Sequence, residues 1–146
     1  MSEVAVSYTL STTTPHPFDA AVSRVREALA DEGFGVLCEI DVQQILKQKL
    51  GVDREPYLIL GACNPQLAHH ALQAEPDLGV LLPCNVVIYT NQGQTHVAAV
   101  NAERMLSIVA NDALTETAAE VSRRLATVID RATAAYDKPS RRTAAP

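Results

Sequence analysis

The stretch that most constrains the fold runs from Tyr57 to Asn85. It begins with a continuously apolar run, Tyr57 to Leu60, of the kind found in a central strand that is covered on both faces. Asn64 can cap a following helix, with Pro65 in the first helical position, where the missing N–H of proline is not needed. A second apolar run follows, and Pro83 interrupts it, so we expect a bulge, a kink or a sheet edge there. Strand and helix therefore alternate in this stretch.

The rest of the chain adds elements by the same criteria, period 2 for strands and 3–4 spacing for helices. The sequence predicts strands over Val4–Leu10, Phe34–Ile40, Tyr57–Leu60, Leu78–Thr90 and Thr95–Val100, and helices over Phe18–Leu29, Val42–Leu50, Pro65–Ala74, Ala102–Val109 and Thr115–Ala135. Asn91 to Gln94 (NQGQ) has the composition of a hairpin turn. We therefore expect an α+β fold with a single mixed β-sheet of about five strands covered by helices, in the order β-α-β-α-β-α-β-β-α.

Length and charge limit the possibilities further. A chain of 146 residues is enough for one domain, which we expect to be compact over 1–136 and to end in a disordered tail over 137–146. The net charge of -5 argues against a nucleic-acid partner, and no apolar run is long enough to cross a membrane. Three cysteines do not make a disulfide framework, and no secretory signal is evident, so we expect a reducing cytoplasm.

Cys63 and Cys84 are the residues with the most chemical potential. Cys63 precedes a helix N-terminus, where the helix dipole favours a thiolate, although a buried packing role is the simpler interpretation. If the strands before and after the helix are parallel, the lengths of helix and strand nearly cancel, and the two sulfurs lie within about 10 Å at the carboxyl end of the sheet. The third cysteine, Cys38, lies inside a predicted strand and is interpreted as a core residue.

Histidine and thiolate together are typical ligands of zinc, copper or haem iron. His69 and His70 follow Cys63 on the predicted helix, but they point about 100° apart, so at most one can join the cysteines. The candidate metal ligands are therefore Cys63, Cys84, His70 and His69, with Met105 or a second copy of the chain as a source of a further ligand. A pair of surface histidines is the simpler alternative.

Four segments resemble a known family: GFGVLCEIDV, ILKQKLG, YLILGACNPQLAHHAL and LGVLLPCNVVIY. Together they are similar to the family called domain of unknown function 302, and the resemblance covers roughly Val22 to Met105. It implies a compact α+β domain of bacteria and archaea that is usually a homodimer, and it implies no activity. The predicted hairpin Val86 to Val100 also favours a homodimer, because a monomer would leave its apolar surface or edge exposed.

These observations favour a small dimeric module that binds a ligand, a transition metal or haem, with Cys63, Asn64, Cys84 and His70 as the ligand-binding residues. One alternative is a thiol-dependent redox enzyme or sensor that uses Cys63. Another is a structural dimer in which both cysteines are inert. The sequence does not decide between these three classes, and whether the protein is an enzyme stays open.

Overall fold

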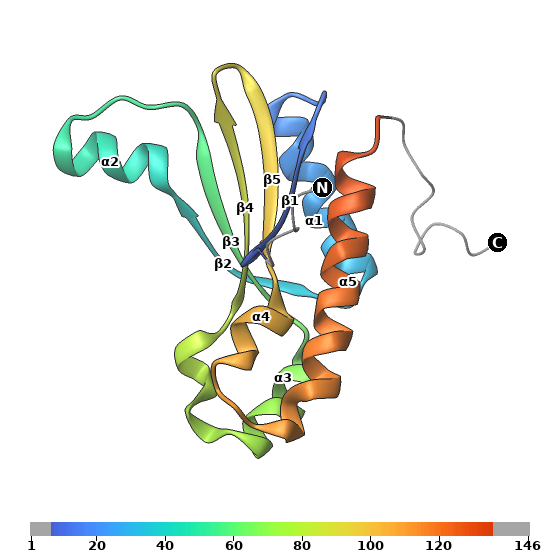
Figure 1. The fold of residues 1–146 in the computed structure, drawn as a ribbon. Coiled ribbons are helices and arrows are strands. Elements are labelled where there is room, and N and C mark those ends of the chain that lie inside the picture. The colour runs from blue at the N-terminus through green and yellow to red at the C-terminus, as the bar shows by residue number, and fades with distance from the viewer. Residues whose placement is uncertain (1–6, 136–146) are drawn as a thin grey trace, which may run out of the picture.

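The computed structural model describes residues 7–135, which form one five-stranded sheet with helices on one face and at one end (Figure 1). The sheet order is β1-β5-β4-β3-β2, and every neighbouring pair is antiparallel. The strands are β1 (Thr9–Thr14), β2 (Gly35–Asp41), β3 (Tyr57–Cys63), β4 (Cys84–Asn91) and β5 (Gln94–Val100).

The helices occupy three places around the sheet (Figure 1). The long helices α1 (Phe18–Asp31) and α5 (Thr115–Thr133) pack against one face, and α2 (Val42–Leu50) stands away from the sheet on the other side. The remaining helices lie beyond the end of the sheet where β3 finishes: α3 (Pro65–Ala74), α4 (Ala102–Ser107) and the two 3₁₀ helices η1 (Pro76–Leu81) and η2 (Asp112–Leu114). Among the described residues no helix is both long and apolar enough to cross a membrane.

The expected α+β class, the single five-stranded sheet and the order of elements are confirmed. The expected mixed pairing was wrong, because β3 and β4 are antiparallel neighbours. The helix α3 does not run back along the face of the sheet, and the segment that was expected to be the start of a parallel strand is the 3₁₀ helix η1. After the cis Leu82–Pro83 peptide, the chain re-enters the sheet at the end where β3 left it.

Local signals in the sequence determine the ends of α2 and the turn of the predicted hairpin. The Asp41 side chain caps α2 by accepting a hydrogen bond from the Gln44 N–H at 2.9 Å, and Gly51 ends the helix with φ 67°. Asn91 pairs with Gln94 across the hairpin, and the two residues between them, Gln92 and Gly93, both have positive φ. This is the two-residue turn that matches the twist of antiparallel strands.

The first strand differs from the expected one. It spans Thr9–Thr14, so the threonine run that follows the expected end at Leu10 belongs to the strand, as the high β-propensity of threonine allows. Val4, Val6 and the expected tail over 137–146 lie outside the described residues.

The core divides into two apolar clusters. The larger lies between the sheet and the helices α1 and α5, and its fully buried members include Leu60, Ile88 and Leu125. The smaller lies beyond the end of the sheet, where Leu78, Leu106 and neighbours from α3, α5 and η2 pack together. The boundary between the two clusters is therefore close to the point where β3 ends and β4 begins.

Candidate functional site

An apolar pocket of about 40 Å³ lies at the boundary between the two core clusters. Its lining combines the end of β3, the start of β4, one side of α3, and residues of α4 and α5. Cys63, Asn64, Cys84 and Met105 belong to this lining. The structure therefore brings three of the four expected ligand-binding residues, and one further sulfur, to a single cavity.

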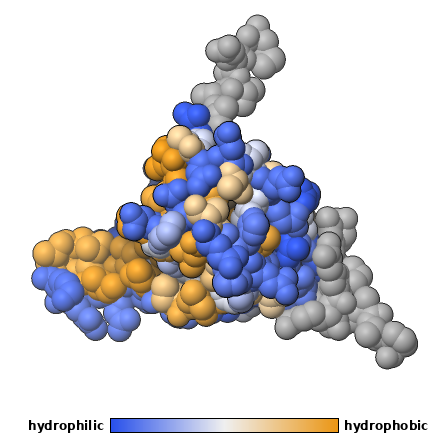
Figure 2. All heavy atoms as spheres, turned by 90° about the horizontal axis from the view of Figure 1, so that it is seen from below, coloured by the Kyte–Doolittle hydropathy of each residue, from blue (hydrophilic) through white to orange (hydrophobic). Residues whose placement is uncertain are grey.

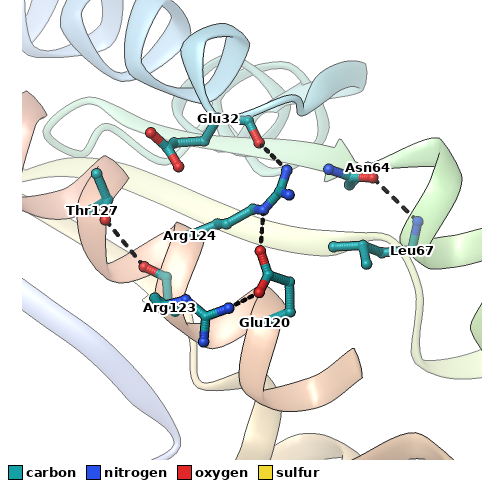
Figure 3. A network of polar contacts seen from close by, with 7 residues as sticks. All are labelled: Glu32, Asn64, Leu67, Glu120, Arg123, Arg124 and Thr127. Atoms are coloured by element: carbon teal, nitrogen blue, oxygen red, sulfur yellow. Dashed lines mark hydrogen bonds and ion pairs between the residues drawn. The ribbon is translucent and has the colours of Figure 1, made fainter. Parts of the chain in front are cut away.

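Cys63 and Asn64 owe their positions to the change from strand to helix. Cys63 is the last residue of β3 and is half-buried, and Asn64 is the N-cap of α3. The Asn64 side-chain oxygen accepts a hydrogen bond from the Leu67 N–H at 3.2 Å (Figure 3). Pro65 takes the first helical position, as the sequence predicted.

Cys84 is the first residue of β4 and lies opposite Ala62 of β3, one residue from Cys63 along that strand. It is buried, with 8% of its surface exposed. Burial, and secondarily the nearby Cys63, raise the pKa of Cys84 from 9.0 to about 11. The two thiols are therefore neighbours at one end of the sheet, but through an antiparallel pair of strands and not through the expected parallel crossover.

The structure leaves both histidines outside this pocket. His69 and His70 are exposed on α3, and neither belongs to the lining. Ala71 is the buried residue of α3, while Leu67 and Ala68 line the pocket, so the histidines occupy the opposite side of the helix. Within residues 7–135 there is no group of three or more His, Cys, Asp and Glu side chains placed to hold a metal ion.

Met105 is the lining residue that the sequence suggested only as a supplementary ligand. It comes from α4, a six-residue helix that Asn101 caps by accepting a hydrogen bond from the Arg104 N–H. Thr117 and Val121 of α5 also line the pocket, and no sequence signal connected them with Cys63. The 3–4 spacing of apolar residues such as Val121 marked the buried side of the predicted helix Thr115–Ala135, but not which cavity that side would meet.

A polar network beside the pocket links α5 to the end of α1 (Figure 3). Arg124 donates to the Glu120 carboxylate at 2.6 Å and to the backbone oxygen of Glu32 at 3.0 Å. Arg123 forms an ion pair with the same Glu120 carboxylate. A Cβ on Gly33 would lie 3.0 Å from the Asn64 side-chain nitrogen and 3.2 Å from the guanidinium of Arg124. The Glu120–Arg124 pair thus helps to hold the end of α1 beside the site.

Replacing Asn64 by alanine should lower the free energy of unfolding by about 1 kcal/mol, because the N-cap hydrogen bond to Leu67 is lost. Urea unfolding would measure the change. Asn64→Asp is the matched control, because it keeps an acceptor oxygen for the cap. If Asn64→Ala were as stable as the wild type but no longer bound a ligand, Asn64 would have a binding role and not a structural one.

The environment of Cys38 also differs from the expected one. Cys38 was interpreted as a core residue, but it is exposed on β2. A bulge between Val36 and Cys38 shifts the strand register, and Cys38 pairs with Gly61. Its sulfur lies over that glycine, 2.6 Å from where a Cβ would be, and Pro83 contacts the same position at 2.8 Å. Cys38 is therefore separate from the pocket that Cys63 and Cys84 line.

Comparisons with known proteins identify a family model and a solved structure that are similar to this chain. A family model described as "Domain of unknown function DUF302" matches residues 10–132. The crystal structure of an uncharacterized conserved protein DUF302 from Bacillus stearothermophilus superposes with a TM-score of 0.82 at 32% sequence identity, covering 87% of this chain and 99% of the other. No curated protein matches the chain.

Proposed function

This chain belongs to the DUF302 family, domain of unknown function, and we propose that it is a homodimeric binding module that holds a soft metal ion, best matched by copper(I), between Cys63 and Cys84. One observation carries the proposal: these two cysteines, from the ends of adjacent strands, line an ion-sized apolar pocket together with Met105.

The chemistry of the lining supports this class of ligand. Thiolate and thioether sulfur are soft ligands that select copper(I), whereas magnesium and calcium prefer oxygen. A volume of about 40 Å³ suits a bare ion and is far too small for a porphyrin, so the pocket favours a metal ion over haem. Binding releases the thiol protons, and the surrounding apolar side chains keep water away from the sulfurs.

Titration with copper(I) under anaerobic conditions, in competition with a coloured copper(I) chelator, tests the proposal. We expect one ion per chain, and we expect Cys63→Ser or Cys84→Ser to weaken binding by more than about tenfold, since even an outer-shell partner of a metal site is worth roughly 10–100-fold. Cys38→Ser is the matched control, because Cys38 is a cysteine outside the pocket. Binding that survives in a Cys63→Ser/Cys84→Ser double variant would refute the proposed site.

A thiol redox function is the second candidate. Cys63 is half-buried just before the N-terminus of α3, with the Cys84 thiol beside it. Hydrogen peroxide could oxidise the pair: the two thiols lose two protons and two electrons to form a disulfide, and the peroxide is reduced to two waters. Mass spectrometry of peptides from the oxidised, unreduced protein would detect a Cys63–Cys84 bond. If the protein bound no copper(I) and formed no such bond, the third class, a structural dimer with inert cysteines, would be favoured.

The homodimer and the cellular location belong to the same proposal. Five of the nine large apolar side chains exposed in the described part of the chain lie between Leu37 and Val52, which supports association. Light scattering should give twice the chain mass of 15.7 kDa. We place the protein in the cytoplasm, where reduced thiols persist.

A further inference from the structure

Residues 37–52, here called the arm, form a structured projection in which the strand residues 38–41 pair with β3 and the helix α2 stands away from the sheet. The arm comprises the end of β2, the helix α2 and the start of the segment that follows it. No residue of α2 is buried, and Leu37, Ile40, Ile45, Leu50 and Val52 are all exposed, Leu50 by 70%. Figure 2 shows the arm extending from the body, with apolar side chains over most of it and hydrophilic ones along one edge.

Contacts within the arm and to the chain beyond it hold this shape. Lys47 forms an ion pair with Asp53 at 2.8 Å, and the Gln43 side chain donates to the backbone oxygen of Arg54 at 2.9 Å. Together with the Asp41 cap and the Gly51 stop, these contacts give α2 defined ends. Its apolar side is therefore presented in a fixed orientation, although nothing in the described chain covers it.

A second apolar surface lies on the face of the sheet away from α1 and α5. A hollow of about 530 Å³ is formed there by β1, β3, β4 and β5, bounded by Leu81, Pro83 and Met105 at the end of the sheet. Tyr57 and Tyr89 line it, with ring centroids 5.2 Å apart, and Tyr89 stacks on His96 at 4.8 Å. These packed rings give the hollow a firm wall.

We propose that the arm of one chain docks in this hollow on a second copy of the chain. The inference rests on the proposed homodimer and specifies which surfaces form it. Each chain carries one arm and one hollow. In a dimer with two-fold symmetry each arm docks in the hollow of the other copy, so both surfaces are covered and the assembly closes at two copies. The apolar side of α2 is then buried, while Lys47, which lies away from the Val42–Ile45 side of the helix, stays in solvent.

The size of the two surfaces is what a stable dimer requires. A typical stable interface uses roughly 20–30 residues on each side. The arm covers residues 37–52, and thirteen residues line the hollow. Together they match that size without any contribution from the rest of the chain, and they contain aromatic anchors of the kind that dominate binding.

Two charge substitutions in the arm test the docking. Ile45→Glu/Leu50→Glu should convert the full-length dimer into a monomer by light scattering at micromolar concentration. The circular dichroism spectrum and the unfolding midpoint at low protein concentration should be unchanged, since no residue of α2 is buried within its own chain. Ile108→Glu is the matched control: Ile108 is 73% exposed but lies outside both the arm and the hollow, so this variant should remain a dimer.

A photocrosslinker placed at Leu50 identifies the surface that the arm meets. In a mixture of isotope-labelled and unlabelled copies, we expect crosslinks between copies, from the arm to peptides within 79–100. Crosslinks to the partner's arm alone, or to the same chain, would overturn the docking. A dimer that survives the two glutamates would overturn the docking and leave the homodimer in place. A wild-type protein that is monomeric at micromolar concentration would overturn both.

Discussion

Raising the pH from 9.0 to about 11 should lower the free energy of unfolding by about 2 kcal/mol through Cys84 alone. Burial, and then the neighbouring Cys63, raise the pKa of this thiol in the folded protein, whereas the unfolded chain keeps the ordinary value. Below pH 9.0 the thiol is protonated in both states, and its contribution is fully present. Above that pH the unfolded state loses the proton first, so the contribution is lost progressively until the pH passes about 11.

Urea unfolding of metal-free protein, with a reductant and a chelator present, measures this loss. Tyrosines and lysines also titrate in this range, so the test is the difference between the wild type and Cys84→Ala. The variant lacks the thiol, and its stability should fall by about 2 kcal/mol less over the same pH interval. An equal fall in both proteins would mean that Cys84 is more hydrated than its burial indicates.

Helices, caps and turns that depend only on nearby residues could be predicted from the sequence. The longest helix follows from the 3–4 spacing of Val121, Leu125 and Val128, which all lie on the buried side of α5. The Asp41 cap and the Gly93 turn follow from side-chain and backbone chemistry within a few residues. Such local signals carry the order of elements, and hence the fold class.

Features that depend on distant parts of the chain were predicted less well. The apolar run through Val80 has the composition of a strand, but it forms the 3₁₀ helix η1, with Val80 exposed and Leu78 buried in the second cluster. Strand direction depends on where that cluster places the chain, which no local pattern encodes. In the same way the bulge at Val36 and Cys38 reverses the expected burial of Cys38.

Within the candidate site, the positions of some residues could be predicted from the sequence and those of others could not. Cys63 and Asn64 could be placed because a strand, a cap and a helix follow one another within a few residues. Cys84 was placed beside Cys63 by an incorrect parallel crossover, and the proximity nevertheless holds because antiparallel neighbours also meet at a strand end. The orientation of His69 and His70 depended on which side of α3 meets the second cluster, and that cluster includes residues as distant in the sequence as Leu114 and Ala118.

Gly61→Ala should lower the free energy of unfolding by about 1–3 kcal/mol, the usual range for overpacking. The added methyl would lie 2.6 Å from the Cys38 sulfur and 2.8 Å from Cγ of Pro83. The exposed Cys38 side chain can rotate away, but the proline ring is closed and sits between η1 and β4, so it can move only with the backbone. Pro83 should therefore cause most of the loss.

A double-mutant cycle separates the two contacts of Gly61. Cys38→Ala alone should change stability by less than about 0.5 kcal/mol, as for an exposed residue, and in the Gly61→Ala background it should restore only part of the loss. Gly35→Ala is the matched control, because a Cβ there meets only the Cys63 carbonyl oxygen at 4.0 Å, an ordinary contact.

Full restoration of stability by Cys38→Ala would show that Pro83 can move aside and that the Cys38 sulfur alone requires glycine at position 61. No loss in Gly61→Ala would show that β3 and β4 can shift apart where they hold Cys63 and Cys84. The pocket would then be adjustable in size, whereas the expected loss means that the strands hold the two thiols at a fixed separation.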